Sequence, residues 1–145
     1  MEKYTGVPYA WGVYKIVILP PNFPFGGMEN PLLTFASPTI IVGDKSGVST
    51  ANHEIAHSWT GNLVTNMNWD SFWLNEGFTV FLERKISKIL NGDAYVKMDG
   101  RNGNSSMYNA MLGYGLTDKF SSLTPRAGNQ NPDDAFSSIP YEKGS

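Results

Sequence analysis

Two histidines in this chain stand four residues apart, and a glutamate directly follows the first of them: His53, Glu54 and His57. Four residues make about one helical turn, so both imidazoles project from one face with Cβ atoms about 5–6 Å apart. Both can then bind one Zn²⁺ at about 2.0–2.1 Å. Glu54 can approach a metal-bound water without binding the metal. This HExxH pattern predicts two metal ligands and a general base on a single helix.

A catalytic zinc ion needs a third protein ligand and one open coordination position. Glu76 is the candidate, because the chain between His57 and Glu76 is long enough for one helix to end and an antiparallel one to return. Asp70, the other acidic residue in that interval, is expected to cap the second helix. The chain has only two histidines, both in the pattern. The alternative is a helix whose histidines pack or face solvent.

Glu83 follows Glu76 by about two helical turns, on the same face. It is a candidate to accept a proton from a ligand imidazole and so fix the tautomer of that ring. The residues equally allow a solvated charge next to Arg84 and Lys85. Both interpretations stay open.

The composition is that of a globular protein. The chain has 145 residues, 41% of them hydrophobic and 17% charged, which suits one domain or part of one. A net charge of −2 indicates neither a nucleic-acid partner nor binding to an acidic membrane surface. With no cysteine, a zinc ion must be held by histidine and carboxylate, and a cytoplasmic location is expected. No signal peptide or apolar run of membrane-spanning length is visible.

Short β-branched segments come first in the chain, and helical periodicity follows. Strands are predicted over residues 14–19, 32–35 and 39–42. Helices are predicted over residues 47–63 and 72–90, with a stop at Asn91 and Gly92 and a third helix capped by Asp93. Mobile loops are expected over residues 99–106 and 124–134, which are rich in Gly, Asn, Ser and Pro. This order predicts an α+β fold.

Four motifs together resemble those of the gluzincin aminopeptidases, in the branch of leukotriene A4 hydrolase and aminopeptidase B. They are Gly-Gly-Met-Glu-Asn at 26–30, His-Glu-Ile-Ala-His-Ser-Trp at 53–59, Trp-Leu-Asn-Glu-Gly at 73–77 and Ser-Ser-Ile-Pro-Tyr-Glu-Lys-Gly at 137–144. The resemblance runs from about residue 7 to residue 145 and is weakest over 93–131. It implies a thermolysin-like metallopeptidase catalytic domain, with short strands followed by a helical zinc-binding lobe.

The resemblance also implies roles for particular residues in the removal of N-terminal residues from peptides. One zinc ion would be bound by His53, His57 and Glu76, with Glu54 as general base. The substrate's free α-amino group would be bound by the loop of Gly26, Gly27, Met28 and Glu29. Tyr141 would donate a hydrogen bond to the oxyanion of the tetrahedral intermediate. From the residues alone, 26–30 reads as a turn and Tyr141 as a core aromatic.

One branch of the family also hydrolyses a lipid epoxide. Asp133 aligns with the acid that directs water in that reaction, but Phe136 stands where the animal enzyme has Tyr. Asp133 has a simpler interpretation as the cap of a helix containing Ala135 and Phe136. Peptide hydrolysis is therefore the main activity predicted.

Full-length members of the family carry an N-terminal β domain before this region and a helical domain after it. Residues 1–145 are therefore expected to form a single truncated catalytic domain. The short segment after Tyr141 is expected to fray, which would leave this tyrosine poorly positioned. An inactive fragment that still binds zinc is the corresponding alternative to an active aminopeptidase.

Overall fold

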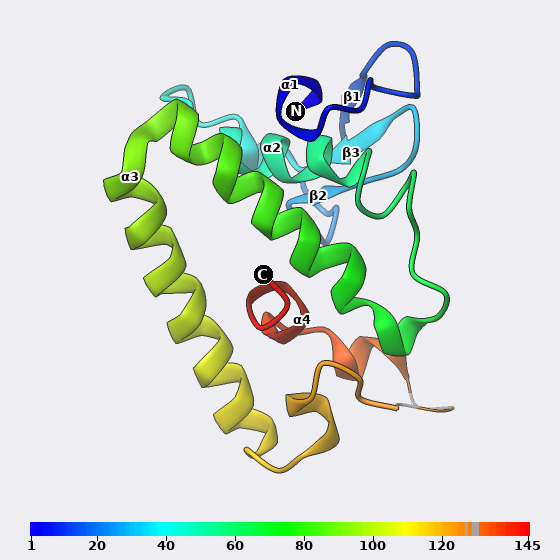
Figure 1. Ribbon diagram of the computed structural model, residues 1–145, viewed down its shortest axis with the longest axis vertical. Helices are drawn as coiled ribbons and strands as arrows, with labels where there is room; N and C mark the ends of the chain where they lie inside the picture. Colours follow the sequence, from blue (N-terminus) through cyan, green and yellow to red (C-terminus); the bar gives the residue numbers. More distant parts are fainter. Residues whose placement is uncertain (127, 129–130) are drawn as a thin grey trace.

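The computed structural model describes residues 1–126, 128 and 131–145, which form a small sheet and a larger helical lobe (Figure 1). The sheet has the strand order β1-β3-β2, with β1 at Ile16–Ile18, β2 at Gly27–Met28 and β3 at Thr34–Ala36. The central strand β3 is parallel to β1 and antiparallel to β2. Its residues Thr34 and Ala36 are buried. The α+β prediction is confirmed.

The predicted strands are correct in part. The first contains β1, and the second overlaps β3, which begins two residues later than predicted. The strand predicted over 39–42 is wrong, because Pro38–Ile40 forms a 3₁₀ helix. Ser37 accepts a hydrogen bond from the backbone N–H of Thr39, and proline suits the first helical position. Residues 27 and 28, read as part of a turn from the residues alone, form β2 instead.

Helix α2, Val48–His57, carries the HExxH pattern and ends earlier than predicted. After His57 the chain turns sharply: the N–H of Asn62 donates to the carbonyl of His57, and the N–H of Val64 donates to the carbonyl of Trp59. Gly61, with φ of 129°, adopts a backbone conformation that favours glycine. The turn brings the backbone back beside the histidine, where it contacts the ring.

Helix α3, Trp73–Tyr114, is a pair of arms that meet at Gly92, where φ is 84° and ψ is 174°. The predicted stop at residues 91–92 therefore coincides with the bend, and Asp93 forms an exposed ion pair with Lys88 at 2.9 Å. The loop predicted over 99–106 is wrong, since the second arm stays helical to Tyr114. Asp70 lies in the 3₁₀ helix Trp69–Ser71, and Phe72 occupies the N-cap position of α3.

Helix α4, Ile139–Glu142, lies between the two arms of α3 (Figure 1). Ile139 is fully buried, and Lys143 donates a hydrogen bond to the carbonyl of Ser121 at 2.9 Å. A Cβ added to Gly77 would lie 2.5 Å from the backbone of Gly144, so the absence of a side chain permits this close packing. The expectation that the segment after Tyr141 frays is therefore wrong for this structure.

The predicted loop 124–134 includes residues 127, 129 and 130, which lie outside the described residues. Its end forms the 3₁₀ helix Pro132–Ala135. Asn131 caps it by accepting a hydrogen bond from the backbone N–H of Asp133 at 3.1 Å, so the prediction that Asp133 is the cap is wrong. The remaining short elements are α1, Glu2–Thr5, and the 3₁₀ helix Lys119–Ser121. No helix within the described ranges is long and apolar enough to cross a membrane.

Candidate metal centre and active site

Parts of β2, α2, α3 and α4 surround one cavity of about 840 Å³. Every site residue predicted from the sequence lines it: Gly26, Gly27, Met28, Glu29, His53, Glu54, His57, Glu76 and Tyr141. Glu83 and Phe136 also belong to its lining, whereas Asp133 does not and is exposed. Residues far apart in sequence thus meet at one place, as the motifs predicted.

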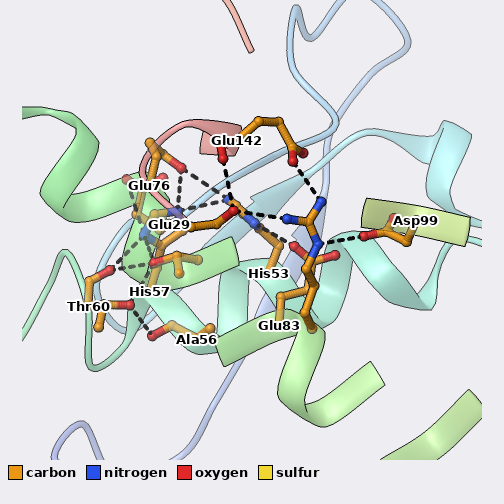
Figure 2. Close-up of polar contacts among 12 residues, drawn as sticks. Glu29, His53, Ala56, His57, Thr60, Glu76, Glu83, Asp99 and Glu142 are labelled. Atoms are coloured by element: carbon orange, nitrogen blue, oxygen red, sulfur yellow. Dashed lines mark hydrogen bonds and ion pairs between the residues drawn. The ribbon is translucent and has the colours of Figure 1, made fainter. Parts of the chain in front are cut away.

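Three of these side chains converge on a single point. The Nε2 atoms of His53 and His57 are 3.1 Å apart. Glu76 places its Oε2 atom 3.2 Å from the Nε2 of His53 and 3.3 Å from that of His57 (Figure 2). Ligand atoms about 2.05 Å from a tetrahedral zinc ion are separated by about 3.3 Å. The three donor atoms therefore fit one zinc ion without rearrangement.

A second group, Glu29, Glu54 and His57, also has possible ligand atoms within 4.8 Å of one another. In this group the Oε1 atom of Glu29 lies 3.9 Å from the Nδ1 of His57. That nitrogen lies 2.9 Å from the carbonyl of Thr60, to which only an N–H can donate. His53, His57 and Glu76 are therefore the candidate metal ligands of this cavity.

Hydrogen bonds at the far side of each imidazole fix its tautomer. The Nδ1–H of His57 donates to the carbonyl of Thr60, and the hydroxyl of Thr79 lies 3.1 Å from the same nitrogen. The Nδ1–H of His53 donates to Glu83 at 3.0 Å. In the neutral rings both Nε2 lone pairs then point toward the carboxylate of Glu76. This arrangement favours a bound cation, and it places Glu83 beside a candidate ligand rather than in solvent.

The electrostatics of the cluster also favour a cation. Burial alone would lower the pKa of His53, but Glu76 and Glu83 more than offset it and raise that pKa to about 10. Burial would also lower the pKa of His57, but Glu76 and Glu29 more than offset it and raise that pKa. Burial would raise the pKa of Glu76, yet the two imidazoles lower it to about 2. The cluster attracts positive charge, which protons or a metal ion can supply.

Glu54 lines the same cavity as the three candidate ligands and is buried. Its Oε2 atom has no hydrogen-bond partner among the described residues. Burial raises the pKa of Glu54 to about 7, where a carboxyl group exchanges protons readily near neutral pH. A Cβ on Gly27 would lie 2.3 Å from the Oε1 of Glu54, so β2 packs directly against this carboxyl group.

Glu29 follows β2 and is held by its backbone, since the side-chain amide of Asn62 donates to its carbonyl at 2.7 Å. Its own carboxylate lines the cavity. A carboxylate there can bind a cationic group of a ligand next to the metal site.

Tyr141 approaches the centre from α4. Its ring centroid lies 6.0 Å from that of His53, with 28° between the planes, and Phe72 and Phe136 flank it. Burial and the carboxylates of the site raise the pKa of Tyr141, so its hydroxyl stays protonated and can donate a hydrogen bond.

The sequence did not predict the residues that hold the site residues in place through hydrogen bonds and ion pairs. Thr79 is fully buried and bonds both to His57 and to the carbonyl of Thr60. Arg84 lies between Asp99 and Glu142 and pairs with both. Because these contacts join separate elements, local spacing carries no signal for them.

Comparison with known proteins identifies the family of this chain. The whole chain, residues 1–145, matches the Peptidase family M1 domain. The chain belongs to this family, which confirms the resemblance drawn from the motifs.

Individual relatives agree with this assignment. Leucine aminopeptidase 2 of Aspergillus niger is 48% identical over 149 residues, which cover 99% of this chain and 24% of that protein. Leukotriene A-4 hydrolase of Xenopus laevis is 51% identical over 137 residues, or 94% of this chain and 22% of that protein. The structure of yeast LTA4 hydrolase in complex with Bestatin superposes with a TM-score of 0.89 at 45% identity, covering 94% of this chain and 22% of that one. The chain thus spans about a quarter of the length of these relatives.

Proposed function

We propose that this chain is the zinc-binding catalytic segment of an aminopeptidase, which hydrolyses the first peptide bond of peptides with a free N-terminus. The observation that carries the proposal is the convergence of three ligand atoms at 3.1–3.3 Å, with Glu54, Glu29 and Tyr141 lining the same cavity. Relatives named leucine aminopeptidase support the same activity.

Each residue of the cavity has a chemical task in this proposal. His53, His57 and Glu76 hold zinc, which when bound lowers the pKa of water and polarises the scissile carbonyl. Glu54 takes the proton of the attacking water and returns it to the leaving amine. Its Oε2 atom, which has no hydrogen-bond partner among the described residues, can accept that proton.

Glu29 and Tyr141 act on the substrate. The carboxylate of Glu29 binds the α-ammonium group, which sets the distance from the N-terminus to the bond that is cut. The protonated hydroxyl of Tyr141 donates a hydrogen bond to the oxyanion as it develops. The contact of Glu29 makes the proposed enzyme an exopeptidase, because internal peptide bonds lack a nearby ammonium group.

Epoxide hydrolysis has less support in this chain. One relative is named leukotriene A-4 hydrolase, yet Asp133 is exposed and outside the cavity lining.

We infer a cytoplasmic location from the absence of cysteine.

The test measures bound zinc and cleavage of an aminoacyl anilide in the same preparation. We expect one equivalent of zinc per chain in wild type and in Glu54→Gln. Cleavage by Glu54→Gln should fall by about 10²–10⁴-fold, because the general base is lost. Asp93→Asn, a change of the exposed carboxylate at the bend of α3, is the control and should cleave like wild type. A zinc-loaded wild type without cleavage would identify an inactive zinc-binding fragment instead.

A further inference from the structure

Arg84 connects three segments that are separate in the sequence. Its Nε atom donates to Asp99 in the second arm of α3 at 2.9 Å, and its Nη2 atom donates to Glu142 in α4 at 2.7 Å. The remaining Nη1 atom donates to the side chain of Ser145 at 2.9 Å. The close-up shows the dashed lines that end at Asp99 and Glu142 (Figure 2). All three guanidinium nitrogens are therefore used.

This junction is adjacent to the proposed oxyanion donor. Glu142 directly follows Tyr141 in α4, and a helix of four residues has little stability of its own. Fixing the carboxylate of Glu142 therefore limits how far the backbone of Tyr141 can move. The planar guanidinium suits this task because its donors keep fixed directions.

Arg84 also follows Glu83, whose carboxylate accepts the hydrogen bond of His53. One turn of α3 thus holds a proposed zinc ligand through Glu83 and the helix of Tyr141 through Arg84. The rings of His53 and Tyr141 stack against each other at the other end of these contacts.

We propose that Arg84 is a positioning residue that holds Tyr141 over the metal site through its contacts with Glu142 and Asp99. The proposal rests on the proposed function for the role of Tyr141 in the reaction, while its structural part can be tested without turnover. A surface ion pair would have no such effect, and the chain offers one for comparison: Lys88 and Asp93, both well exposed on the same helix.

The first test is hydrogen exchange of α4 in the zinc-loaded chain. The amides of Glu142 and Lys143 donate to the carbonyls of Ser138 and Ile139. In Arg84→Met we expect these two amides to exchange about tenfold faster, with α2 unchanged. Lys88→Met, the matched control, should exchange like wild type. Wild-type exchange in Arg84→Met would overturn the proposal.

Two further variants guard against a general loss of folding. Glu142→Gln keeps the size of the side chain but removes its charge, and it should also speed exchange in α4. Arg84→Lys keeps the charge but loses the fixed fork of donors, so its exchange should fall between wild type and Arg84→Met. Equal exchange in Arg84→Lys and Arg84→Met, with Glu142→Gln like wild type, would overturn the proposed contact.

The second test asks whether Arg84 acts through Tyr141. We expect Arg84→Met to lower kcat by about tenfold, with KM and zinc content little changed. This loss is smaller than the loss of about 10²–10³-fold that follows when an oxyanion donor is removed. In a Tyr141→Phe background the same change should have almost no effect. Equal losses in both backgrounds would overturn the proposal. A zinc-loaded wild type without turnover would contradict the proposed function, and the exchange of α4 would then decide on Arg84.

Discussion

The cavity has two walls that hold their functional groups by different means. The metal wall, formed by α2 and the first arm of α3, carries His53, His57 and Glu76. Two of these proposed ligands, His57 and Glu76, are at most 3% exposed. Each imidazole is also fixed by a hydrogen bond from within the same two helices and the turn between them.

The tyrosine wall consists of α4 and carries Tyr141. Only four residues long, this helix is placed by the buried Ile139 and by polar contacts to Arg84 and Ser121. Packed helices define the first wall, and a few contacts between distant segments define the second. We therefore expect metal binding and transition-state stabilisation to be separable by mutation.

The largest effect should come from removing a ligand in the metal wall. His57→Asn should leave zinc at background levels and abolish cleavage, because two ligands hold the ion too weakly. The zinc-dependent gain in stability, about 4.1 kcal/mol at free zinc 1,000 times Kd, should disappear as well. Metal analysis after dialysis and thermal unfolding with added zinc would measure both. A chelator should bring wild type to the same state, and one equivalent of zinc in His57→Asn would refute the assignment.

In the tyrosine wall, Tyr141→Phe should lower kcat by about 10²–10³-fold, since one oxyanion donor is lost. Zinc content and unfolding temperature should stay close to those of wild type, because the ring and its packing remain. Steady-state kinetics and metal analysis on one preparation would check this, with Tyr4→Phe, which changes an exposed tyrosine, as control. Loss of zinc in Tyr141→Phe would show that the two walls are not separable.

The metal wall could be predicted from the sequence because its information is local. The spacing of His53 and His57 places both rings on one face of a helix, and the break at Gly92 follows from glycine alone. The α+β class followed from the order of strands and helices, and the predicted site residues all line the cavity.

The tyrosine wall could not be predicted in the same way. Residues 99–106 have a loop-like composition, yet they are helical where α4 packs against them and Gly103 lies close to Glu142. Tertiary contacts there override weak helix propensity. The contacts of Arg84 link positions that no periodicity relates. Residues 39 and 40 belong to a 3₁₀ helix capped by Ser37 rather than to the predicted strand 39–42.

A smaller effect in the metal wall is expected from Glu83→Gln. The carboxylate orients the ring of His53 and increases its basicity, so zinc affinity should fall by about 10–100-fold. Competition with a chelator of known affinity would measure the change, and zinc-saturated enzyme should regain most of its activity. Asp93→Asn, in the same helix but remote from the metal, should bind zinc like wild type. Equal zinc affinity in Glu83→Gln and Asp93→Asn would instead mean that the carboxylate of Glu83 has no role at the metal.

The last effect, on stability alone, should come from the packing of the tyrosine wall at Gly77. An added Cβ would lie 2.5 Å from the carbonyl carbon of Gly144, so the end of the α4 segment must shift. We expect Gly77→Ala to lower the free energy of unfolding by about 1–3 kcal/mol, as overpacking does. Gly100→Ala in the second arm of α3 meets nothing within 4 Å and should gain up to about 1 kcal/mol from helix propensity. Urea unfolding of both variants checks the difference, and equal stabilities would mean that the end of the α4 segment adapts without cost.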